Sequence, residues 1–163
     1  MSLQSVQAFF ATHAPDIAVI ETETSSATVA LAAEAHGVEP DQIAKTICLR
    51  AGDDILLLVT AGMRRLDNRK FRNHFGAKPR MLGGEEVTEI TSHPIGGVCP
   101  FGLPSSLPIY CDVSLKEHAI VVPAAGATNS AVRIVPGRMA ELVSATWVDV
   151  CNLPEQPASE NHQ

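Results

Sequence analysis

The fold of this chain is decided by the sequence IAKTICLR, AGDD and ILLLVTA, which run without interruption over residues 43–61. Two runs rich in aliphatic and β-branched residues flank a turn of small and acidic residues, which is typical of two strands joined by a tight connection. Neither face of the first run is hydrophilic. This segment therefore predicts a largely buried pair of strands, 43–50 and 55–61.

The elements on either side follow from hydrophobic periodicity and from capping residues. Towards the N-terminus we expect a helix over residues 2–13, a short strand over 17–21, a helix from Ser26 as its N-cap to His36, and a helical turn opening at Pro40. Towards the C-terminus we expect a basic helix from Asp67 to Gly76, helices over 84–91 and 136–144, a helical turn over 114–117, and strands over 107–111, 118–122, 131–135 and 147–150. Strands outnumber long helices and do not alternate with them. The fold class predicted is α+β, with a mixed, largely antiparallel, barrel-like sheet flanked by several helices.

Composition limits the class of protein. The chain has 163 residues, of which 45% are hydrophobic and 18% charged, so we expect one globular domain over residues 1–153. The polar stretch 154–163 predicts a disordered tail. The chain lacks an apolar run of membrane-spanning length and a basic signal-peptide start, so a cytoplasmic location without membrane contact is expected. The four cysteines have no metal-ligand spacing and are expected to be reduced, with no metal bound.

A glycine-rich loop, GGVCPFG at residues 96–102, is the most informative candidate site. Glycine lets a backbone approach a ligand closely, and Pro100 stiffens the turn. Such a loop recognises its ligand through main-chain N–H and C=O groups. The sequence contains no GxSxG motif of a serine hydrolase, no GxxxxGK(S/T) phosphate-binding loop and no GxGxxG dinucleotide-binding motif after a strand. It implies no cofactor.

Individual side chains leave alternatives open. Lys45 shares a strand face with Ile47, so its ammonium lies at an edge, snorkels to water or sits in a pocket where it could hold a phosphate. Asn129 and Ser130 belong either to an ordinary turn or to a pocket wall opposite the glycine-rich loop. Cys99 would need a base to act as a nucleophile, and His93 is the one histidine near it in sequence.

Charge is unevenly distributed along the chain. Residues 64–80 contain seven of the twelve basic residues and carry a net charge of +6, whereas the whole chain carries −6. The segment is either a solvated helix face or a phosphate-binding patch. The candidates for phosphate contact in it are Arg64, Arg65, Arg69, Lys70 and Arg72.

The lysine strand 43–50, the GxxxP loop at 96–100 and the late pattern PGRMAEL at 136–142 together resemble the YbaK family of prolyl-tRNA synthetase-associated editing domains. The resemblance covers residues 20–150 and implies a free-standing, trans-acting hydrolase that cleaves the ester bond of mischarged aminoacyl-tRNA. It assigns catalytic roles to Lys45, Gly96, Gly97 and Pro100. Substrate binding would fall to the neighbouring positions Thr46, Val98, Cys99, Phe101, Asn129 and Ser130.

In this family the water is oriented by the loop backbone and the substrate's own 2′-hydroxyl, without metal or covalent intermediate. An activated ester needs little more than an oriented water and hydrogen bonds to the developing oxyanion. The partners implied are the acceptor end of mischarged tRNA and a synthetase, with no DNA. The basic candidates between residues 64 and 80 would then contact the acceptor stem of the tRNA. Two other hypotheses remain open. One is a non-catalytic module that binds tRNA or a synthetase, and the other is a hydrolase that uses Cys99 as its nucleophile.

Overall fold

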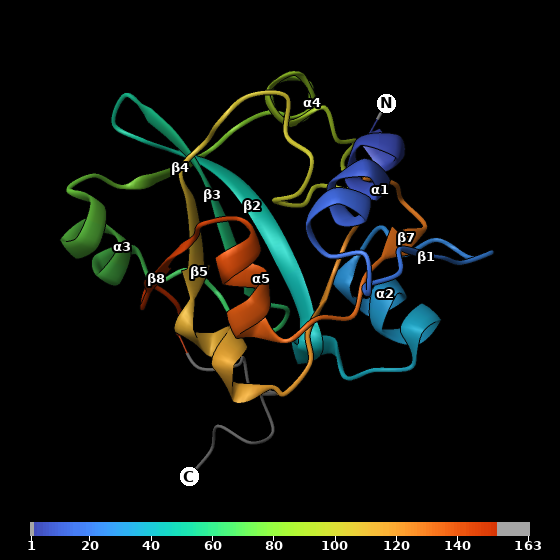
Figure 1. The fold of residues 1–163 in the computed structure, drawn as a ribbon. Helices are drawn as coiled ribbons and strands as arrows, with labels where there is room; N and C mark the ends of the chain where they lie inside the picture. Colours follow the sequence, from blue (N-terminus) through green and yellow to red (C-terminus); the bar gives the residue numbers. More distant parts are fainter. Residues whose placement is uncertain (1, 153–163) are drawn as a thin grey trace, which may run out of the picture.

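A computed structural model describes residues 2–152 and shows a mixed α+β fold (Figure 1). The predicted fold class is therefore confirmed. The helices are α1 (Ser2–His13), α2 (Val29–His36), α3 (Asn68–Phe75), α4 (Gly84–Thr91) and α5 (Pro136–Leu142), with short 3-10 helices η1 (Pro40–Gln42) and η2 (Val113–Glu117). The strands are β1 (Ile20–Glu21), β2 (Ile43–Ala51), β3 (Asp54–Ala61), β4 (Pro79–Met81), β5 (Ile109–Asp112), β6 (Val122–Pro123), β7 (Ser130–Ala131) and β8 (Thr146–Val148).

The main sheet is built around the β2–β3 hairpin and runs in the order β4-β2-β3-β5-β8, with β6 also paired to β2. β2 is antiparallel to β3 and to β4, whereas β6 is parallel to β2, β5 to β3 and β8 to β5. A second, two-stranded sheet joins β1 and β7. The main sheet stays open between β4 and β8 and is not a closed barrel. Its antiparallel part consists of β2, β3 and β4, and the tight turn at 51–54 accounts for the antiparallel pairing of β2 with β3.

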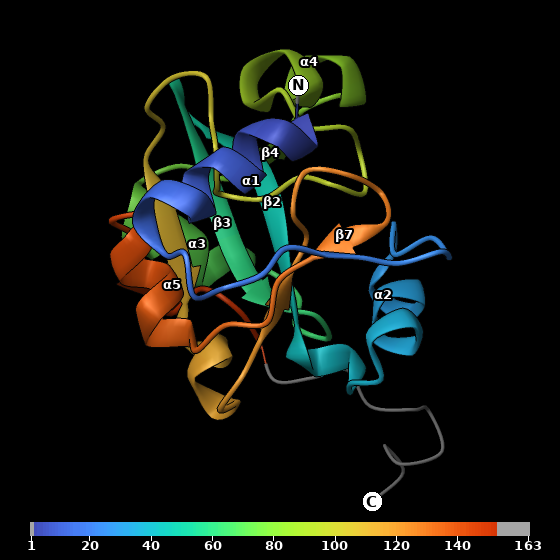
Figure 2. The ribbon, with the colours of Figure 1, turned by 45° about the vertical axis from the view of Figure 1, so that its right-hand side comes forward.

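The two faces of the sheet pack against different elements. One face, carrying Cys48, Leu57 and Val59, packs against α1, α5 and the glycine-rich loop. The other, carrying Leu49 and Leu58, is covered by α3 and the segment after β8. Figures 1 and 2 show α3 on one side of the sheet and α1 on the other. Ala44 and Cys48 of β2 therefore belong to one core and Leu49 and Ala51 to the other, as strand alternation demands.

Capping residues set the helix boundaries. Asp67 accepts hydrogen bonds from the N–H groups of Arg69 and Lys70, and Gly76 ends α3 in the left-handed conformation, as predicted. The N-cap predicted at Ser26 is wrong. Thr28 caps α2 instead, because Ser26 donates its N–H and hydroxyl to the carbonyl of Thr128 and so belongs to a loop contact.

Several predicted strands are shorter than expected. The strand predicted over 118–122 is reduced to β6, because the N–H of His118 still bonds to Leu115 in the preceding helical turn. The strands predicted over 17–21, 131–135 and 147–150 likewise pair over only two or three residues, in β1, β7 and β8. The tail predicted over 154–163 lies outside the described residues. No helix within residues 2–152 is long and apolar enough to cross a membrane.

Candidate functional site

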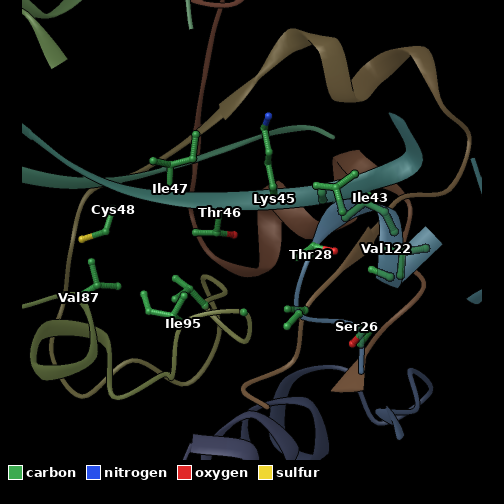
Figure 3. Close-up of a pocket in the computed structure, with 18 of the residues that line it drawn as sticks. Ser26, Thr28, Ile43, Lys45, Thr46, Ile47, Cys48, Val87, Ile95 and Val122 are labelled. Carbon is green, nitrogen blue, oxygen red and sulfur yellow. The ribbon is translucent and has the colours of Figure 1, made fainter. Parts of the chain in front are cut away.

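A cavity of about 270 Å³ lies where the main sheet has a gap along one edge of β2 (Figure 3). Ile43 and Ala44 pair with β6, and residues 49–51 pair with β4. Residues 45–48 have no strand beside them on that edge within the described chain. Residues from both faces of β2 line the cavity, so it wraps around this open edge.

The cavity wall is almost entirely neutral. Lys45 is the one charged residue among the lining residues that the structure describes. The remaining polar side chains are short, and they come from β2, from the segment before α2 and from β7: Thr46, Cys48, Ser26, Thr28 and Ser130. A wall of this kind can offer hydrogen bonds and apolar contact, but within residues 2–152 it contains no carboxylate or imidazole that could act as a general base.

Glycines in the 94–102 loop let three chain segments meet at the cavity. The N–H of Gly126 donates to the carbonyl of Gly97 at 3.1 Å. A Cβ on Gly97 would lie 2.8 Å from the nitrogen of Ala127, and one on Gly96, whose φ is +90°, would lie 2.7 Å from the Cβ of Ala27. Any side chain at either position would push the segments apart. Gly96 and Val98 line the cavity, whereas Gly97 supports the loop from behind.

The remaining loop residues named from the sequence do not reach the cavity. Cys99, Pro100 and Phe101 are buried and are absent from its wall. His93 holds the loop together: its Nε2 lies 2.8 Å from the carbonyl oxygen of Phe101, and its Nδ1 lies 2.5 Å from Oγ of Ser2. These contacts give the loop its shape rather than a reactive group.

The structure places Cys99 and His93 together but in a setting that opposes thiol chemistry. Sγ of Cys99 lies 3.5 Å from Nε2 of His93, and both side chains are 0% exposed. Burial raises the pKa of Cys99 to about 12 and lowers the pKa of His93. A neutral, enclosed thiol is a poor nucleophile, so the geometry argues against a hydrolase that uses Cys99.

Lys45 faces the opposite side of the sheet from the glycine-rich loop. Its Nζ donates to the carbonyl oxygens of Arg64 at 2.7 Å and Gly62 at 3.2 Å. Figure 3 shows its side chain pointing away from Val87 and Ile95, whereas Thr46 points towards them. Burial lowers the pKa of this ammonium. The sequence allows three positions for Lys45: at a sheet edge, at the surface or in a pocket. The structure places it at the open edge of β2, with its ammonium on the face opposite the glycine-rich loop.

The polar turn that contains Asn129 and Ser130 contributes one residue to the cavity and one to the surrounding loops. Ser130 is fully buried and lines the cavity, with its Oγ 3.1 Å from the N–H of Ala127. Asn129 turns away and donates its side-chain amide to the carbonyl of Thr22. Ser130 therefore belongs to the candidate site, and Asn129 supports the loop.

Arg64 is buried in an ion cluster and is not a surface residue. Its Nη2 lies 2.8 Å from Glu117 and 3.2 Å from Asp41, which also contacts Nε2 of His118 at 2.8 Å. Burial alone would raise the pKa of Asp41, but hydrogen bonds from His118, Met63 and Arg64 outweigh it and hold the pKa below its usual value. This geometry does not support the prediction that Arg64 contacts tRNA.

The other basic candidates lie on or before α3, on the Lys45 side of the sheet and away from α2 (Figure 1). Lys70 pairs with Asp149 at 3.1 Å. Arg65, Arg69 and Arg72 are exposed. Arg65 is close enough to Lys45 to contribute to the lowering of its pKa. The glycine-loop side of the cavity and the basic residues of α3 thus lie on opposite faces of the sheet, and the cavity reaches Lys45 at the open edge of β2.

Some cavity residues carried little signal in the sequence. Val87 from α4 and Ile95, which directly precedes the glycine-rich loop, belong to its apolar wall. Their periodicity is that of any helix face and loop, and only their position across the gap gives them a role. The described residues contain no group of three or more His, Cys, Asp or Glu side chains able to hold a metal ion.

Comparison with known proteins gives a consistent result. A family model described as an aminoacyl-tRNA editing domain matches residues 23–142. The uncharacterised protein YwhH of Bacillus subtilis (strain 168) is 48% identical over 153 residues, which cover 93% of this chain and 98% of YwhH. A proline–tRNA ligase of Moorella thermoacetica is 32% identical over 105 residues, covering 62% of this chain and 18% of the ligase.

The likeness extends to structure. A crystal structure described as that of a candidate trans-editing enzyme for prolyl-tRNA synthetase matches with a TM-score of 0.85 and 31% identity, and the match covers 93% of this chain and 98% of that one. The family model covers most of the chain and includes the open edge of β2, the glycine-rich loop and β7. The family predicted from the sequence is confirmed: this chain belongs to the aminoacyl-tRNA editing domain family.

Proposed function

We propose that this protein is a trans-acting editing hydrolase that cleaves the ester bond of mischarged aminoacyl-tRNA. The observation that carries the proposal is the neutral cavity at the gap in the sheet, enclosed by the glycine-rich loop and open along β2. Its size suits a small aminoacyl group and the adjoining ribose. The shortage of ionisable groups suits a reaction whose substrate is already activated.

The proposed reaction requires no side chain that acts as a strong base or a nucleophile. Water adds to the acyl carbon, the bond from that carbon to the ribose 3′-oxygen breaks, and a proton from the water goes to the leaving oxygen. The products are a free amino acid and a tRNA with a free 3′-hydroxyl. In the proposed mechanism, main-chain N–H groups of the loop around Gly96 and Val98 orient the ester and donate to the developing oxyanion, and the substrate's 2′-hydroxyl orients the water. Such a mechanism would make the enzyme specific for RNA.

The open edge of β2 also gives the tRNA a path. The aminoacyl group would lie on the glycine-loop face, and the 3′-terminal phosphate would cross the edge towards Lys45 and Arg65. Arg65 lies close enough to Lys45 to lower its pKa, and the exposed Arg69 and Arg72 belong to α3. Phosphate contacts of this kind would give binding that weakens steeply with salt.

A second function is favoured by one specific observation. No carboxylate or imidazole lines the cavity among the described residues, so the site could bind the aminoacylated end of a tRNA without hydrolysing its ester bond. A non-catalytic binding module would hold tRNA or a synthetase and release no amino acid.

One experiment separates these functions. Purified protein is incubated with tRNA charged with Ala, Ser, Thr, Cys or Pro, and amino acid release is followed beside a no-enzyme blank. We expect rapid release of one or a few noncognate amino acids, and at least tenfold less with Lys45→Ala, which should remain folded by circular dichroism. Binding of every charged tRNA with release at the blank rate would establish the binding module instead. Full activity in a folded Lys45→Ala protein would remove Lys45 from the mechanism.

A further inference from the structure

Thr46 presents three polar groups at the cavity that no other described residue satisfies. Its Oγ1 is buried and has no hydrogen-bond partner within residues 2–152. Its main-chain N–H and C=O lie in the part of β2 that has neither β4 nor β6 beside it. A donor and two acceptors held unpaired at the wall of a cavity are typical of a site that binds a ligand.

The register of the hairpin shows which way the main chain of Thr46 points. The N–H of Leu57 donates to the carbonyl of Pro108, and the N–H of Ala61 donates to Oγ of Ser114, so these main-chain groups face the β5 side. Main-chain direction alternates along a strand, which turns Leu58 and Thr60 towards β2.

Their partners in the hairpin fix the rest of the pattern. Ile47 is paired with Leu58 and Lys45 with Thr60, so the main-chain groups of Ile47 and Lys45 are used within the hairpin. Thr46 lies between them and faces the opposite way. Its N–H and C=O therefore point out of the sheet edge, into the gap that the cavity occupies.

We propose that Thr46 binds the α-amino group of the aminoacyl ester, so that the enzyme accepts esters with a free amine and rejects N-acylated ones such as peptidyl esters. This inference rests on the proposed function and names the substrate class of the same site. An α-aminoacyl unit carries a donor and an acceptor on either side of one carbon, as a residue of a β-strand does. It can therefore pair with one edge residue through two hydrogen bonds, in the manner of an added strand.

The charge and shape of the cavity favour this orientation. A protonated amine needs acceptors, and the lining residues offer no carboxylate. Within residues 2–152, Oγ1 of Thr46 has no hydrogen-bond partner, and the carbonyl oxygen of Thr46 points into the gap, so both are available as acceptors. With the amine and the acyl carbonyl held along the edge, the substrate side chain stands perpendicular to the sheet. It then points to the apolar wall that includes Val87 and Ile95.

An N-acyl group would remove the charge and replace two of the amine hydrogens with a bulky carbonyl group beside the carbonyl of Thr46. We therefore expect wild-type protein to hydrolyse alanyl-, seryl- or threonyl-tRNA with a kcat/KM on the order of tenfold to a hundredfold higher than for the same tRNA carrying the N-acetylated amino acid, each corrected for its own blank. Equal rates on free and N-acetylated esters would overturn the inference while leaving the proposed function intact. Release from none of them would overturn the proposed function itself.

Two variants test the hydroxyl separately. Thr46→Val keeps the shape and the main-chain groups but removes Oγ1, and Thr46→Ser keeps the hydroxyl. We expect Thr46→Val to lose several-fold in kcat/KM on the free-amine ester with no change in the residual rate on the N-acetylated ester, and Thr46→Ser to retain the discrimination. An equal loss on both esters in Thr46→Val would show that the hydroxyl does not contact the amine.

Discussion

Gly97→Ala tests whether close contact between the glycine-rich loop and the 126–131 segment builds the site. The new Cβ would lie 2.8 Å from the nitrogen of Ala127 and 2.9 Å from its carbonyl carbon, whereas ordinary contact begins at 3.4 Å. The two segments would have to separate by about 0.6 Å, because both partners are backbone. That movement takes the bond from Gly126 to Gly97, now 3.1 Å long, beyond hydrogen-bonding range.

The magnitude follows from these two effects. Overpacking costs about 1–3 kcal/mol and the lost hydrogen bond about 1 kcal/mol, so we expect a destabilisation of roughly 2–4 kcal/mol. For a domain of this size that lowers Tm by roughly 4–16 °C. The same displacement moves Ser130 at the cavity wall, and a shift of that order reduces kcat/KM by at least about tenfold.

Gly137→Ala is the matched control. Gly137 lies in α5, and a Cβ there would meet nothing within 4 Å. Alanine in a helix is more favourable than glycine by about 0.5–1 kcal/mol, so Tm should rise slightly and deacylation should be unchanged. Thermal unfolding by circular dichroism and the deacylation assay are run on both variants. A Gly97→Ala protein with wild-type Tm and wild-type activity would refute the packing argument.

Three further outcomes are expected. Cys99→Ala should lose about 1 kcal/mol of stability in urea unfolding and keep deacylation within about threefold of wild type, whereas an inactive but folded variant would restore the thiol mechanism. Arg64→Leu should lose about 1–3 kcal/mol in urea, because Asp41 loses a charged partner, and its tRNA binding should keep the wild-type salt dependence; unchanged stability with weakened binding would return Arg64 to tRNA contact. Burial lowers the pKa values of His93 and His36 below their ordinary 6.5. The unfolded state therefore binds more protons below that pH, and urea stability should fall as pH drops from about 6.5 to 5. Stability that is flat over this range would contradict the neutral state of the buried His93 ring and the half-buried His36 ring.

The sequence predicts the elements whose causes are local. The hairpin of β2 and β3 is set by its apolar runs and by the turn between them, and α3 is set by Asp67 and Gly76 at its two ends. The short strands are different, because β6 and β7 pair over only two residues each and owe their pairing to neighbours far along the chain. Hydrophobic period cannot separate such a segment from a loop that runs beside a sheet.

The site was predictable in its residues but not in its geometry. Alternation along β2 places Lys45 with Ile47 and Thr46 with Cys48, and this much follows from the sequence. Which pair faces the glycine-rich loop depends on the long connection from β3 to β5, which carries the loop across the face of Cys48. The burial of Arg64 is also a long-range effect, because Asp41 and Glu117 lie 23 and 53 residues from it in sequence.

The gap in the sheet has a physical consequence for selectivity. Unpaired edges are normally shielded, and a buried polar group without a partner destabilises a fold by about 1–3 kcal/mol. Thr46 keeps its edge groups open because β6 and β4 both stop short of it. In solution these groups can bond to water, and a ligand must replace those bonds to gain affinity. A ligand that contacts the apolar wall but cannot pair with Thr46 displaces water from these groups without replacing its hydrogen bonds. The free energy lost in this way roughly cancels the free energy gained from hydrophobic contact. In the proposed binding mode, discrimination therefore comes first from the amine and acyl carbonyl that every aminoacyl ester shares, and only then from the fit of the side chain against Val87 and Ile95.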